Sequence, residues 1–218
     1  MAEPSSETIT QKPRIPMLKH APQTTEETRR SLKWRVVDIA VGAAVGVMSG
    51  VMFWVFDGMS YGLFPLLTLI LPGSAALLHA LFYFPATLGL LIVRKPGASD
   101  YVLLVASFVE VVLGTKYSVS LVVIALVQAL AAETVFAVFR YRRWTLGVTL
   151  LSSVAIGIVY NFYLLFFYYQ AFSFFSPRGL IGTACELLSA IVFAGFGSWI
   201  LYRALAKSGV LTRFVSGR

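Results

Sequence analysis

Long apolar runs separated by short polar or basic stretches dominate the chain from residue 34 onward. A helix of about 20 residues, rising ~1.5 Å per residue, crosses the ~30 Å hydrocarbon core of a bilayer. Six runs reach or approach this length, and we expect each of them to form a transmembrane helix. The runs are 34–56, 74–93, 99–114, 118–140, 145–171 and 180–206.

A seventh apolar run, 62–71, is too short to span a bilayer. Asp57-Gly58 precedes it, Pro72-Gly73 follows it, and Pro65 lies inside it. Glycine and proline at these spacings are typical of loops. We therefore expect a structured hydrophobic loop after the first helix.

The distribution of basic residues supports six spans over seven. Cytoplasmic loops of membrane proteins carry an excess of Lys and Arg. With six spans, one side of the membrane receives Lys33, Arg35, Arg94, Lys95, Arg140, Arg142, Arg143, Arg203, Lys207 and Arg213, and the other receives Lys116 and Arg178. The pattern predicts that both termini are cytoplasmic.

The composition fits an all-α integral membrane protein. Hydrophobic residues make up 58% of the 218 and charged residues only 13%, against about 25% charged in soluble domains. The net charge of +8 then marks cytoplasmic loops and not nucleic-acid binding. The single Cys185 excludes an intramolecular disulfide, and two histidines, His20 and His79, make a histidine metal site improbable.

Enzyme motifs are missing from the sequence. It contains no Walker A loop, no nucleophile elbow and no HExxH, so it has no sequence motif for hydrolysing ATP or cutting a bond. We expect no enzyme activity, no cofactor and no metal. Uphill transport would require partners that supply energy.

Polar residues recur inside the spans, although polar groups at membrane depth are costly. Helical periodicity places Glu110, Gln128, Asn161 and Glu186 on inward faces of four different helices, at mid to outer depth. Glu133 lies nearer the cytoplasmic end. Each group alone fits an interhelical hydrogen bond or a protonated acid, but together they favour a shared cavity.

The acids have no basic residue at comparable depth to neutralise them. A positively charged ligand that enters from outside would supply the partner, and Trp54, Tyr160 and Tyr163 offer stacking and cation–π faces. A proton relay is the competing use of the acids.

Small residues form two stripes on the first span. Gly42, Gly46 and Gly50 give overlapping GxxxG steps, and Ala40 and Ala44 form a pair on an adjacent face. Such stripes let helices pack closely. Packing inside the bundle and docking of a separate membrane subunit both fit them.

Four segments resemble the YkoE family of substrate-binding (S) components of energy-coupling-factor (ECF) transporters. They are WRVVDIAVGAAVGVMSGVMFW from residue 34, LPG from 71, IVRKPGA from 92 and LVQALAAETVFAVFRYRRW from 126. The resemblance covers residues 34–206. It leaves 1–33, which we expect to be a disordered cytoplasmic tail, and 207–218, a basic cytoplasmic tail.

The resemblance implies a multi-pass protein of a prokaryotic plasma membrane that takes up thiamine or its precursor hydroxymethylpyrimidine. S components bind a vitamin from outside, with the loop after the first helix as a lid. They dock on a transmembrane (T) component driven by two ATPase subunits. Ala40 and Ala44 would form the T-docking surface.

The ligand's chemistry and the buried polar residues suggest an assignment. We expect Glu110 or Glu186 near the thiazolium and Gln128, Glu133 and Asn161 at the pyrimidine edge, with the three aromatic residues Trp54, Tyr160 and Tyr163 stacking. The alternatives are a self-sufficient proton-coupled carrier, with Glu133 and Glu186 as relay, and a membrane-bound scaffold or enzyme subunit whose buried acids are structural.

Overall fold

The computed structural model describes residues 32–115, 120–168, 170, 173–209 and 211. Most of each predicted tail lies outside this part of the chain, since 1–31, 210 and 212–218 are not described. Within the described residues the structure is helical and contains no β-strand, as predicted.

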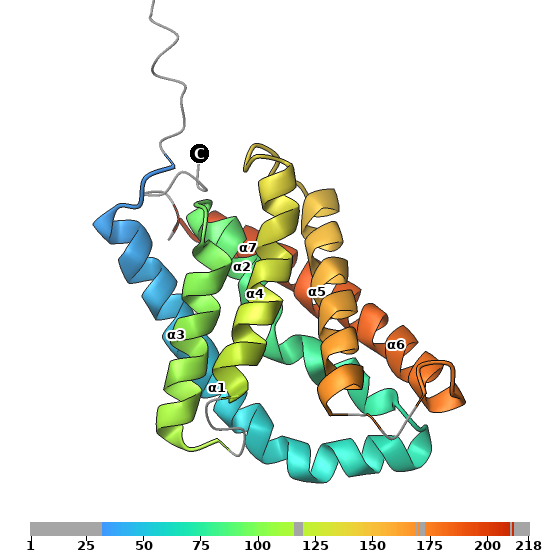
Figure 1. The fold of residues 1–218 in the computed structure, drawn as a ribbon. Helices are drawn as coiled ribbons and strands as arrows, with labels where there is room; N and C mark the ends of the chain where they lie inside the picture. The colour runs from blue at the N-terminus through green and yellow to red at the C-terminus, as the bar shows by residue number, and fades with distance from the viewer. Residues whose placement is uncertain (1–31, 116–119, 169, 171–172, 210, 212–218) are drawn as a thin grey trace, which may run out of the picture. The chain divides into compact units, whose positions relative to one another are not determined.

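Helix α1, Val36–Ile70, is 35 residues long and includes the run predicted to be a loop. Figure 1 shows it descending along α3 and then turning to run across the end of the bundle. The loop prediction is therefore wrong. Extending an existing helix requires no new nucleation, so Gly58 does not end it, and Pro65 is accommodated inside it.

The segment after α1 is the most buried part of the bundle. A 3₁₀ helix, η1 (Ser74–Phe82), leads into α2 (Phe84–Val93). Together they form one apolar stretch of 20 residues. Thr87 of α2 donates to the Ala194 carbonyl over 2.7 Å, which ties this central segment to the last one.

The remaining helices complete the bundle. The last three form one uninterrupted run, in which a π-helical segment, η2, joins α6 to α7. Their bounds are α3 Ala98–Leu113, α4 Ser120–Val138, α5 Leu146–Phe167, α6 Pro177–Ser189, η2 Ala190–Gly197 and α7 Ser198–Lys207.

Five helical stretches in the described part of the chain are long and apolar enough to cross a membrane. They are Val36–Ile70, Ser74–Val93, Ser120–Val138, Leu146–Phe167 and Pro177–Lys207. The remaining predicted span, 99–114, corresponds to α3, which has 16 residues and extends only ~24 Å. This multi-pass architecture is that of an integral membrane protein.

The glycine stripe of α1 packs inside the bundle. A Cβ on Gly46 would lie 2.7 Å from the Val105 side chain, and one on Gly50 would lie 2.5 Å from the Ala106 carbonyl oxygen. Only glycine permits this approach of α1 to α3. Ala40 and Ala44, in contrast, are exposed.

Candidate functional site

A main cavity of about 220 Å³ opens among helices of the bundle. Its lining is mostly apolar and aromatic with a few polar groups, which is the usual make-up of a small-molecule site. The cavity is lined by Phe53, Phe64, His79, Phe82, Ser107, Glu110, Leu121, Ile124, Ala125, Gln128, Tyr160, Leu164 and Tyr168.

The structure brings three of the predicted site residues into this cavity. Glu110 of α3 and Gln128 of α4 are buried, with 1% and 3% of their surface exposed, and both line the cavity. Tyr160 of α5 contributes an aromatic ring to the same lining. A carboxyl group, an amide and an aromatic ring therefore face one space.

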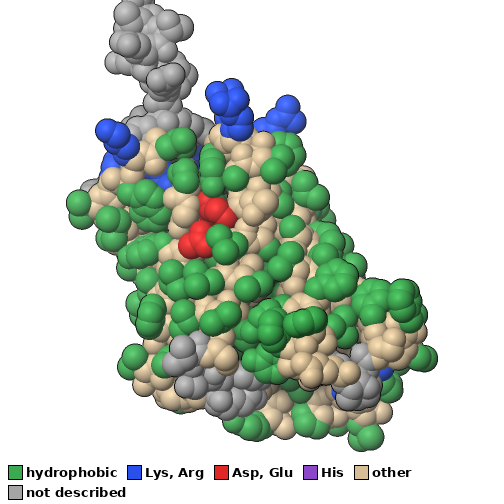
Figure 2. Space-filling model, in the orientation of Figure 1, with side chains coloured by type: hydrophobic (Ala, Val, Ile, Leu, Met, Phe, Trp, Pro, Cys, Tyr) green, Lys and Arg blue, Asp and Glu red, His purple; other side chains and the backbone are tan. Residues whose placement is uncertain are grey.

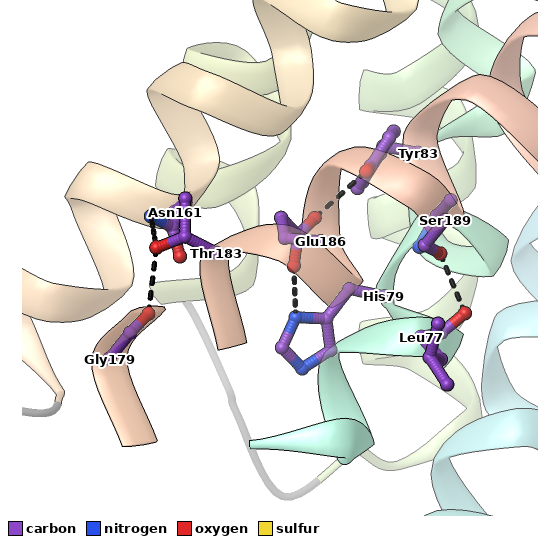
Figure 3. A network of polar contacts seen from close by, with 9 residues as sticks. Leu77, His79, Tyr83, Asn161, Gly179, Thr183, Glu186 and Ser189 are labelled. Atoms are coloured by element: carbon purple, nitrogen blue, oxygen red, sulfur yellow. Dashed lines mark hydrogen bonds and ion pairs between the residues drawn. The ribbon is translucent and has the colours of Figure 1, made fainter. Parts of the chain in front are cut away.

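A small cavity of about 70 Å³ lies beside the main one, and His79 and Leu164 line both. Two further predicted residues, Asn161 and Glu186, line the small cavity. Asn161 donates through Nδ2 to the Thr183 hydroxyl over 2.9 Å, and Thr183 donates to the Gly179 carbonyl over 2.8 Å (Figure 3).

Glu186 is held by two residues of the η1–α2 segment, as Figure 3 shows. Its Oε2 lies 2.6 Å from His79 Nδ1, and its Oε1 accepts a hydrogen bond from the Tyr83 hydroxyl over 2.8 Å. The expectation that the acids have no nitrogen base at their depth is therefore wrong for Glu186. Sequence reasoning missed His79 and Tyr83 as its partners.

A signal for this pair was present in the sequence. His79 is the only histidine inside a predicted span, and Tyr83 follows it by four residues. What the sequence does not show is that Glu186, 107 residues later, packs against them.

Glu133 lines neither cavity. Its carboxylate accepts hydrogen bonds from the Tyr141 hydroxyl and the Gly97 N–H, both over 2.7 Å, and from the Ser99 N–H over 3.3 Å. Burial, followed by the hydrogen bond to Glu133, raises the pKa of Tyr141, so its hydroxyl stays protonated and donates. Glu133 therefore joins α4 to the turn between α2 and α3.

Trp54 and Tyr163 also lie away from the main cavity. Trp54 is 44% exposed, and the preceding residue, Phe53, lines the main cavity in its place. Tyr163 lines an open groove with Phe166 and Phe174. The aromatic lining is instead supplied largely by phenylalanines, which carry no polar signal in an apolar run.

The described residues contain no group of three or more His, Cys, Asp or Glu side chains placed to hold a metal ion. Glu110, Glu133 and Glu186 each have different surroundings.

Residues 37–159 match the family described as "ABC-type cobalt transport system, permease component". The chain is also 25% identical over 189 residues to the "Putative HMP/thiamine permease protein YkoE" of Bacillus subtilis (strain 168), covering 85% of this chain and 91% of that one. A solved structure of "an S-component of ECF transporter" superposes with a TM-score of 0.77 and 26% identity, over 85% of this chain and 92% of that chain. The chain belongs to this permease family, as a YkoE-type S component.

The names of the proteins similar to this S component indicate different transported substances. The family description names cobalt, whereas the Bacillus protein is named for HMP and thiamine. The predicted family and the membrane-transport class are confirmed by these similarities. The cargo of this chain has to be argued from its own cavity.

Proposed function

We propose that this chain is the substrate-binding subunit of an ATP-driven ECF-type importer and that its main cavity binds thiamine or hydroxymethylpyrimidine. The observation that carries the proposal is the lining of that cavity, where Glu110 and Gln128 share one space with Phe53, Phe82 and Tyr160. The name of the Bacillus relative agrees with this cargo.

The chemistry of an aminopyrimidine fits these groups. The flat ring stacks on aromatic side chains, and the Gln128 amide offers both a donor and an acceptor to the ring edge. The Glu110 carboxyl accepts from an amino group or faces a thiazolium cation, and the aromatic faces add cation–π attraction.

The size of the main cavity favours the single-ring ligand. A cavity of roughly 150 Å³ holds benzene, so a cavity of about 220 Å³ holds one substituted pyrimidine. The two rings of thiamine need more space. Displacement of the second half of α1, which places Phe64 in the lining, would provide it.

Coupling to transport follows the S-component scheme. We propose that both termini are cytoplasmic, in line with the gathering of Lys and Arg side chains at the end of the molecule where α1 begins (Figure 2). Ala40 and Ala44 would meet a T component through their exposed face of α1, and two ATPase subunits would supply the energy. Gln128 and Glu110 would then release the ligand to the cytoplasm.

The test is a titration of the purified protein in detergent with hydroxymethylpyrimidine, thiamine and Co²⁺. We expect saturable binding of at least one of the two organic ligands without added nucleotide, with an increase in Tm. Mass spectrometry of small molecules that co-purify gives an independent identification. Binding of Co²⁺, with no binding of hydroxymethylpyrimidine or thiamine and no change in Tm with either, would contradict the proposed cargo.

A second candidate is the self-sufficient proton-coupled carrier, which the buried Glu186–His79 pair favours. Glu133 is a poor member of the proposed relay, because it accepts hydrogen bonds from N–H groups at the start of α3 and lines neither cavity. Uptake by proteoliposomes that contain this chain alone, driven by a proton gradient, would support the carrier over the ATP-driven importer.

A further inference from the structure

The main cavity is lined by a histidine whose Nδ1 meets a carboxylate that does not line that cavity. Glu186 is fully buried, and its two oxygens meet His79 Nδ1 at 2.6 Å and the Tyr83 hydroxyl at 2.8 Å. Glu186 lines the small cavity, while His79 lines both. The imidazole of His79 therefore lies in contact with both the Glu186 carboxylate and the main cavity.

Further contacts restrain the backbone and the ring. Ser189, three residues after Glu186 on α6, accepts the Ala80 N–H at 3.2 Å and donates to the Leu77 carbonyl over 2.6 Å. These bonds flank His79 on η1. The rings of Phe64 and Tyr160 meet the imidazole edge-on, with centroids 5.8 and 5.6 Å away.

The contact with Glu186 sets the tautomer of the ring. A carboxylate only accepts hydrogen bonds, so the contact needs a proton on Nδ1, and a ring that carries this proton alone leaves Nε2 as an acceptor. The Nδ1 edge faces Glu186 and the opposite edge of the ring points away from it (Figure 3). Of the two cavities Glu186 lines only the small one, whereas His79 lines both, so we infer that the Nε2 edge is the one presented to the main cavity.

We propose that His79 recognises an amino group of the ligand through Nε2, and that Glu186 and Tyr83 are positioning residues that hold the acceptor tautomer. The proposal rests on the proposed function and assigns the amino edge of the pyrimidine to His79. An acceptor at this place bonds an amino group and is repelled by a carbonyl oxygen. We expect the chain to prefer hydroxymethylpyrimidine to its 4-oxo analogue by about 10–100-fold, the effect of one unmatched buried polar group.

The first test needs no ligand. The chain has two histidines, so ¹⁵N-histidine labelling of the His20→Asn variant leaves His79 as the single signal. At neutral pH we expect NMR to show a protonated Nδ1 and a bare Nε2, and Glu186→Leu to abolish this state. Two protonated nitrogens, or a bare Nδ1, in the His20→Asn protein alone would overturn the proposal, whether or not Glu186→Leu folds.

The second test measures Kd for hydroxymethylpyrimidine and its 4-oxo analogue. His79→Asn keeps a donor toward Glu186 and removes Nε2, so we expect the preference for the amino compound to fall about 10–100-fold. His79→Gln, whose longer amide reaches the place of Nε2, should restore part of it. His20→Asn serves as the matched histidine control and should leave the preference unchanged.

The outcomes separate this inference from the proposed function. Retention of the amino preference in His79→Asn, or an equal loss of affinity for both compounds, would overturn the role of His79 while leaving the importer intact. Failure of the His20→Asn protein to bind either pyrimidine or thiamine would instead defeat the proposed function, and the NMR result would still report on the tautomer.

Discussion

The three buried glutamates show how the partners of a side chain decide its role. Glu110 lines the main cavity, Glu186 bonds a histidine and a tyrosine, and Glu133 bonds two backbone N–H groups and Tyr141. Sequence periodicity correctly gave Glu110 and Gln128 a common inward space. It could not separate Glu133 from them, because the donors to Glu133 come from the start of α3 and from the residues after α4, whose positions the periodicity does not specify.

Glu110→Gln should discriminate between the two proposed ligands. The change keeps the size of the side chain and removes its charge. Because only thiamine carries a fixed positive charge, we expect its Kd to rise about tenfold or more while that of hydroxymethylpyrimidine changes less. Isothermal titration of both ligands measures the difference. An equal change for both would show that the charge of Glu110 does not select the cation.

Glu133→Leu should lower stability and leave ligand affinity unchanged. The substitution removes the acceptor of the Gly97 and Ser99 N–H groups and of the Tyr141 hydroxyl. Each buried donor left without an acceptor costs about 1–3 kcal/mol, so we expect Tm to fall by about 5 °C or more.

The neighbouring Thr134, which is exposed and bonds within its own helix, supplies the control. Thr134→Ala should change Tm little. If the Kd for hydroxymethylpyrimidine rose more than about threefold in Glu133→Leu at a temperature where the protein is folded, Glu133 would have a role at the ligand site.

At the scale of elements, α1 combines two structural roles. Its first half packs on α3 through glycines, and its second half contributes Phe64 to the main cavity. The glycine spacing alone left open whether the stripe faced the bundle or a partner. The second half was wrongly predicted to be a loop from Gly58 and Pro65. Both residues are instead accommodated in a helix that has already formed upstream of them.

Gly50→Ala should disrupt the packing of α1 on α3. The added Cβ would lie 2.5 Å from the Ala106 carbonyl oxygen, which is backbone and cannot turn aside. We expect Tm to fall by several degrees, corresponding to about 1–3 kcal/mol of overpacking. Gly58→Ala, in the same helix with nothing within 4 Å, is the control and should leave Tm unchanged or raise it. Similar effects of both changes would indicate that α1 does not pack on α3 in this way.

Ala40→Trp combined with Ala44→Trp tests the exposed face of α1. Both positions are exposed, so the ligand affinity and Tm of the isolated chain should stay unchanged, while uptake by the complete transporter should be lost. The control is Leu130→Trp on α4, which is 56% exposed and should permit uptake. A loss of binding in the double variant would contradict docking and indicate a packing role for these alanines.

The whole molecule has two unlike ends. At the end where α1 begins, Trp34 Nε1 donates to the Pro96 carbonyl over 2.9 Å and Arg94 donates to the Tyr202 hydroxyl over 2.8 Å. Arg94 also lies over the ring of Trp144, 5.6 Å from its centroid. These contacts join the start of the described bundle at Trp34 to the α2–α3 turn, to Trp144 and to α7. Charge patterning predicted that the basic residues would share a side. The hydrogen bonds at this end of the molecule depend on three-dimensional packing, which the pattern does not specify.

At the opposite end, the helical state of residues 58–70 has a consequence for its surroundings. A loop there would carry backbone N–H and C=O groups that lipid cannot solvate, so it would have to remain against protein or water. A helix satisfies most of these groups internally, and Leu66, Leu69 and Ile70 are exposed on it. The backbone of this segment would therefore stay satisfied in contact with lipid. The displacement proposed above for a larger ligand would then leave no backbone group unpaired, and we expect the surrounding lipid to influence how readily it occurs.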